Sequence, residues 1–74
     1  MITYFWRAKN LRTEEIVELP PGVDFVGEES AFKSATYHLR AGVREGTIDS
    51  GPYTVEVISS DPVRMFERSR TINV

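Results

Sequence analysis

One stretch of the sequence, SAFKSATYHLRAGVRE from Ser30 to Glu45, has the periodicity of an amphipathic helix. At about 100° per residue, its apolar side chains fall on a single stripe. This stripe consists of Ala31, Phe32, Ala35, Leu39 and Val43. Two acidic residues, Glu28 and Glu29, precede it and suit the positive end of a helix dipole. We therefore expect a helix of about three to four turns that starts near Glu28 to Ser30 and ends at Gly42 or Gly46.

Strand-forming runs flank this helix on both sides. Ile2 to Lys9 is rich in aromatic and β-branched residues, and Tyr53 to Ile58 alternates apolar with polar side chains. Glu14 to Leu19 has too few apolar residues for its period to separate strand from helix, but the short connector before it favours a hairpin. Val63 to Thr71 is expected to pair with the preceding strand, and the charges on both its faces are typical of an edge strand.

The order β-β-α-β-β predicts an α+β fold, with a small antiparallel sheet of three to four strands and one helix packed across one face. Seventy-four residues suffice for one domain, which we expect to span 1–74. The chain has no cysteine, which excludes a disulfide framework and a cysteine-based zinc site. One face of the sheet would then remain open to water or to a partner.

The first strand should divide its side chains between these two faces. We expect Ile2, Tyr4 and Trp6 to pack under the helix. The opposite face would carry Phe5, Arg7 and Lys9, joined by Phe66 and, if the first and last strands are neighbours, by Arg68 and Arg70. In the segment before the helix, Phe25 and Val26 are expected to lie against the core.

The sequence offers little for catalysis or metal binding. Its only imidazole, His38, is expected to be a half-buried helix residue, and no nucleophile motif or phosphate-binding glycine loop is present. The carboxylates lack the alternating spacing of a metal-binding loop. These carboxylates are Glu14, Glu15, Asp24, Glu28 and Glu29. We expect no enzymatic activity, no cofactor, no metal and no small-molecule substrate.

The polar side of the helix is the best candidate for a contact surface. Lys33, Tyr37, Arg40 and Arg44 lie within about 60° of arc on a regular helix. Three cations around a tyrosine can grip an acidic protein patch or phosphates, although such a face can also serve only to keep a helix soluble. The second candidate surface is the open sheet face with Phe5 and Arg7.

These observations predict a small interaction module that docks on a protein partner or self-associates as a homodimer. The net charge of −2 conceals separated signs, since residues 14–29 are acidic without any basic residue, and this separation favours oriented docking. The alternative is a nucleic-acid-binding protein that uses Lys33, Arg40, Arg44 and the aromatic-basic first strand. The N-terminal sequence does not resemble a secretory signal and no apolar stretch reaches about 20 residues, so we expect a cytoplasmic protein without a membrane partner.

Overall fold

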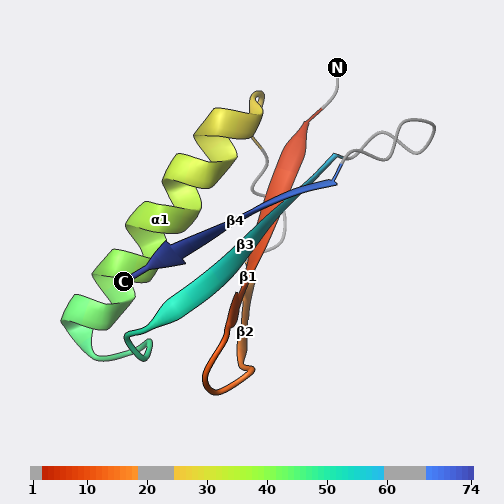
Figure 1. Ribbon diagram of the computed structural model, residues 1–74. Helices are drawn as coiled ribbons and strands as arrows, with labels where there is room; N and C mark the ends of the chain where they lie inside the picture. Colours follow the sequence, from red (N-terminus) through yellow and green to blue (C-terminus); the bar gives the residue numbers. More distant parts are fainter. Residues whose placement is uncertain (1–2, 19–24, 60–66) are drawn as a thin grey trace.

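The computed structural model describes residues 3–18, 25–59 and 67–74. Its elements in chain order are β1 (Tyr4–Asn10), β2 (Ile16–Glu18), α1 (Glu28–Glu45), β3 (Pro52–Ser59) and β4 (Glu67–Asn73). The strands form one antiparallel sheet in the order β2-β1-β3-β4, and α1 lies across one of its faces (Figure 1). The predicted α+β fold and the β-β-α-β-β order are confirmed.

The first hairpin resolves the alternative that the sequence left open, because Ile16–Glu18 is a short strand paired with β1. Asn10, buried at the end of β1, organises the turn between them. Its side-chain Oδ1 accepts hydrogen bonds from the backbone N–H groups of Arg12 and Thr13, at 2.8 and 3.1 Å. The turn thus depends on a polar side chain that belongs to the strand.

The helix ends at Gly46, the later of the two predicted stops. Gly46 adopts the left-handed conformation with φ of 80°, and its N–H bonds to the carbonyl of Val43 at 3.2 Å. The other candidate, Gly42, lies inside the helix and is buried. A Cβ atom there would come within 2.7 Å of Ile48 Cγ1, so the glycine permits the following loop to fold back onto the helix.

The core fills the space between α1 and the two central strands, β1 and β3. Its buried apolar residues are Trp6, Ala8, Ala31, Phe32, Ala35, Leu39, Tyr53, Val55 and Val57. Four of the five residues of the predicted helix stripe are therefore buried, whereas Val43 is only half-buried. The inward position of Trp6 is confirmed, Tyr4 packs partly buried against this core, and Ile2 lies outside the described residues. Phe25 also packs against it, and it exchanges backbone hydrogen bonds of 2.7 and 2.8 Å with Tyr4. Val26 does not, because its side chain is 73% exposed.

The last strand differs from its prediction in position and in neighbour. It runs to Asn73 rather than Thr71, while residues 63–66, including Phe66, lie outside the described residues. β3 separates it from β1, because the regular apolar alternation of β3 suits a central strand. Arg68 and Arg70 pair with Val57 and Val55, whose side chains point toward α1. The two arginines therefore lie on the helix side and do not join Phe5, Arg7 and Lys9.

Candidate functional site

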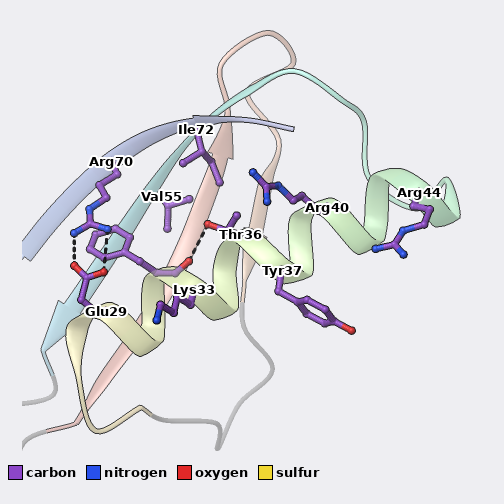
Figure 2. A pocket seen from close by; sticks show the side chains of 10 residues that line it. Glu29, Lys33, Thr36, Tyr37, Arg40, Arg44, Val55, Arg70 and Ile72 are labelled. Carbon is purple, nitrogen blue, oxygen red and sulfur yellow. Dashed lines mark hydrogen bonds and ion pairs between the residues drawn. The ribbon is translucent and has the colours of Figure 1, made fainter.

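A groove of about 390 Å³ lies between the flank of α1 and the helix-facing side of β4, here called the α1–β4 groove (Figure 2). Its lining residues are Glu29, Phe32, Lys33, Thr36, Tyr37, Arg40, Arg44, Val55, Arg70 and Ile72. All four residues of the basic helix face that the sequence singled out are therefore part of one concave surface. The volume is at the lower end of the range of roughly 300–1,000 Å³ that is usual for ligand pockets.

The floor of the α1–β4 groove is apolar. Phe32 and Val55 are buried core residues, and Ile72 packs against them from β4. The hydroxyl of Thr36 donates a hydrogen bond of 3.0 Å to the carbonyl of Phe32 within the helix (Figure 2). That hydroxyl is already satisfied, so a ligand need not supply it with a partner. The floor suits the apolar part of a side chain or an extended backbone rather than a fully hydrated ion.

One end of the groove is electrically compensated. Both terminal nitrogens of Arg70 bond to the Glu29 carboxylate, Nη1 to Oε2 at 3.3 Å and Nη2 to Oε1 (Figure 2). The Arg70 guanidinium also lies 4.1 Å from the centre of the Phe32 ring, in a cation–π contact. Beside this pair, Arg68 Nη1 lies 2.7 Å from Glu28 Oε1. Two acids at the start of α1 thus neutralise two cations of β4.

This ion pair shifts the pKa values of both of its members. The hydrogen bond from Arg70, reinforced by the positive charges of Arg70 and Lys33, lowers the pKa of Glu29 below its ordinary value. The same hydrogen bond to Glu29 raises the pKa of Arg70. Both groups are exposed to solvent, so the pair contributes little to stability and is open to competition from another carboxylate.

The remaining length of the groove carries cations that are not held in ion pairs. Within the described ranges, Lys33, Arg40 and Arg44 form no ion pair. Figure 2 shows the Arg40 side chain extending toward β4 near Ile72, whereas Tyr37 projects outward. Tyr37 is 74% exposed, which leaves its ring accessible to a partner. Cations that border an apolar floor are an arrangement suited to carboxylates on an amphipathic ligand.

The two other predicted site residues lie on the opposite face of the sheet. Phe5 is 38% exposed there, and Arg7 Nη2 forms an ion pair with Glu56 Oε2 at 3.1 Å. Glu18 lies opposite Arg7 on the neighbouring strand, so acids on both sides offset this cation. The structure therefore separates Phe5 and Arg7 from the α1–β4 groove, and the described residues of the open sheet face carry no comparable excess of positive charge.

His38 is exposed rather than half-buried as expected, because it lies just outside the apolar stripe. Its ring centre is 5.6 Å from that of Trp6, with the two planes inclined by 56°. The Trp6 Nε1–H donates to Ser34 Oγ at 3.3 Å, so the histidine covers one margin of a buried tryptophan. In the part of the chain that the structure describes, no three potential metal ligands among His, Cys, Asp and Glu cluster together.

Sequence reasoning missed the contribution of β4 to the groove. The predicted strand ended at Thr71 and so left out Ile72, and Arg70 was placed on the open face if the first and last strands were neighbours. The strand pattern alone does not show that β4 lies beside the flank of α1. The available signal was their alternate spacing, which places both on the same side of a strand.

Comparisons with protein-family models, with curated proteins and with solved structures found no match to this chain. Among the described residues, no helix combines the length and apolar character needed to cross a membrane.

Proposed function

We propose that this protein is a non-enzymatic, cytoplasmic binding module that docks an acidic segment of a partner protein in the α1–β4 groove. The observation that carries the proposal is the row of Lys33, Arg40 and Arg44, which border an apolar floor and form no ion pair with another described residue. Charge complementarity selects carboxylates, and the floor supports an amphipathic chain. The absence of cysteine fits a reducing compartment.

A protein partner accounts for the groove better than a nucleic acid does. The chain has a net charge of −2 and a pI near 5.3, which opposes general attraction to a phosphate backbone. Nucleic-acid grooves stack successive bases on exposed aromatic rings. In the α1–β4 groove Tyr37 is exposed, whereas Phe32 is buried beneath Arg70. A single exposed ring supports one contact rather than a stacking series.

The first test measures binding of a fluorescently labelled acidic peptide by anisotropy. The double variant Arg40→Ala with Arg44→Ala should bind roughly 5- to 100-fold more weakly, because it removes two charge-assisted contacts. The control, Lys9→Ala with Arg12→Ala, removes two cations outside the groove and should bind like the parent protein. Equal weakening by both double variants would show that binding follows net charge, which contradicts a specific groove.

A second variant of the same test should act in the opposite direction. Because Glu29 occupies Arg70, Glu29→Gln should release that guanidinium and raise peptide affinity several-fold. Glu15→Gln, on the β1–β2 turn, changes the net charge equally and should leave affinity unchanged. If single-stranded nucleic acid binds at physiological salt and the acidic peptide does not, the assignment to a protein partner is wrong.

A further inference from the structure

The strand that forms one wall of the α1–β4 groove is also an edge of the sheet. β4 pairs with β3 on one side, and no described strand lies beyond it. An edge strand presents backbone N–H and C=O groups that another extended chain can pair with. Groove and edge therefore adjoin, because residues of both α1 and β4 line the groove. Figure 1 shows the C-terminal end of β4 next to α1.

The hydrogen-bond register identifies which backbone groups face outward. Gly51 and Val74 exchange N–H···O=C bonds of 2.8 and 3.0 Å. Hydrogen-bonded and non-hydrogen-bonded pairs alternate along an antiparallel ladder, so Arg68, Arg70 and Ile72 direct their backbone groups toward β3. The intervening residues direct theirs away from the sheet. These residues are Ser69, Thr71 and Asn73.

We propose that the partner segment binds as an extended strand that pairs antiparallel with the outer edge of β4 and points alternate acidic side chains into the α1–β4 groove. This inference rests on the proposed function and specifies its ligand. The antiparallel orientation continues the sheet, whose strands are all antiparallel and whose pairing is the more stable kind.

The register also defines which guest side chains enter the groove. On the outer edge, Arg70 and Ile72 occupy non-hydrogen-bonded positions, at which facing Cα atoms approach to about 4.5 Å. Guest residues opposite these two positions share their face and so point toward α1. A carboxylate opposite Arg70 can compete with Glu29, and one opposite Ile72 comes near Arg40, which Figure 2 shows beside that residue.

A second copy of the chain is a poorer occupant than an acidic segment. Pairing of two β4 edges would bring two grooves together, each with the cations Lys33, Arg40 and Arg44. The β2 edge of a second copy would offer Val17 on the helix side, because Ile16 and Glu18 point to the open face. Among the paired residues of β2 and β4 that the structure describes, none places a carboxylate on the groove side.

The probe is a capped seven-residue peptide that alternates threonine with glutamate, with threonine at both ends. Two comparison peptides keep its length: one replaces each glutamate with lysine, and the other has the same composition with the three glutamates adjacent. The alternating acidic peptide should bind at least tenfold more tightly than either. This order of affinities is expected only if binding depends both on negative charge and on the alternation of side chains along a strand.

Backbone pairing is tested without altering the protein. Guest threonines lie opposite Ser69, Thr71 and Asn73 and direct their N–H groups at β4, whereas guest glutamates direct theirs away. N-methylation of the two inner threonines should therefore reduce affinity at least tenfold. N-methylation of glutamates should change it less than about threefold. If N-methylation of the threonines and of the glutamates changes affinity equally little, strand pairing is wrong, while binding in the α1–β4 groove still stands.

A matched pair of protein variants completes the test. Thr71→Pro removes an outward N–H that β3 does not use, and proline is tolerated on an edge strand, so the fold should persist. Thr71→Pro should lower the affinity for the alternating acidic peptide at least tenfold. Thr71→Val, which keeps the N–H, should bind this peptide like the parent protein. If no acidic peptide binds the parent protein, the proposed function itself fails. A sizing measurement that shows a dimer dispersed by Thr71→Pro would assign the edge to a second copy instead.

Discussion

At the scale of single residues, Glu29 holds the place at Arg70 that the proposal gives to a carboxylate of the partner. In the structure Glu29 neutralises Arg70, whose guanidinium lies 4.1 Å from the centre of the Phe32 ring. Under the proposed function, the acidic segment would displace Glu29 from Arg70. Because the ion pair is exposed, we expect this displacement to cost little.

The pKa of Glu29 provides a direct measurement of this contact. A carboxyl whose pKa is lower in the folded state stabilises the fold fully above its ordinary value, and this contribution is lost as pH falls through the folded-state pKa. NMR titration should place the Glu29 pKa below 4.5, its ordinary value. In Arg70→Gln, or at high salt, the pKa should rise toward that value. An unchanged pKa in Arg70→Gln would show that Arg70 is not the cause.

At the scale of elements, α1 and the loop after it pack closely because Gly42 has no side chain. Ile48 packs half-buried over Gly42, in the space that a Cβ atom would occupy. Alanine is favoured over glycine by about 1 kcal/mol in a helix interior, so the two effects oppose each other at this position. The steric conflict should dominate, since the Ile48 Cβ atom is itself only 3.0 Å away from the added carbon.

Gly42→Ala should therefore destabilise the protein by about 1–3 kcal/mol, measured by urea unfolding monitored through Trp6, the only tryptophan. In an Ile48→Ala background the space is free, and the same substitution should be neutral or stabilising. A double-mutant cycle without coupling between the two positions would contradict this account of the glycine.

The elements themselves were largely predictable from the sequence. The spacing of Phe32, Ala35 and Leu39 defines the helix, and the alternation of β3 defines its buried face. The boundaries were less certain, because Gly42 and Gly46 carry the same sequence signal and only packing against Ile48 distinguishes them. The burial of Phe25 but not Val26 likewise depends on the backbone pairing with Tyr4, which no local pattern reveals.

At the scale of the whole molecule, the core is small and depends on few side chains. At roughly 0.05–0.15 kcal/mol per residue, a chain of this length has a stability of about 4–11 kcal/mol. Leu39 is fully buried at the middle of the interface between α1 and the sheet. Its truncation to alanine should lower the free energy of unfolding by about 2–5 kcal/mol. Val43→Ala, at a half-buried position on the same stripe, should cost clearly less.

Thermal and urea denaturation of the two variants would check this difference. Leu39→Ala should lose a large part of the total stability and populate the unfolded state at moderate temperature. Equal, small losses for Leu39→Ala and Val43→Ala would indicate that the helix does not anchor the core through its central leucine.

The candidate site could be predicted only in part, because it arises from tertiary arrangement. Helical spacing was enough to group Lys33, Arg40 and Arg44. Their relation to Arg70 and Ile72 depends on β3 taking the central position, which is a matter of sheet order rather than of any one segment. The condition on which Arg68 and Arg70 were placed beside the first strand, that the first and last strands are neighbours, is not met for the same reason.

If the α1–β4 groove binds a strand as proposed, the placement of a helix flank alongside an edge strand limits the length of the motif that it can recognise. Side chains on one face of a helix recur about every 5.4 Å, whereas those on one face of a strand recur about every 6.7 Å. Because the two repeats differ, helix side chains and strand side chains that start level are out of step by about 4 Å after three repeats. We therefore expect only about three successive guest positions to match cations of the groove, so that a short motif would determine the specificity of binding.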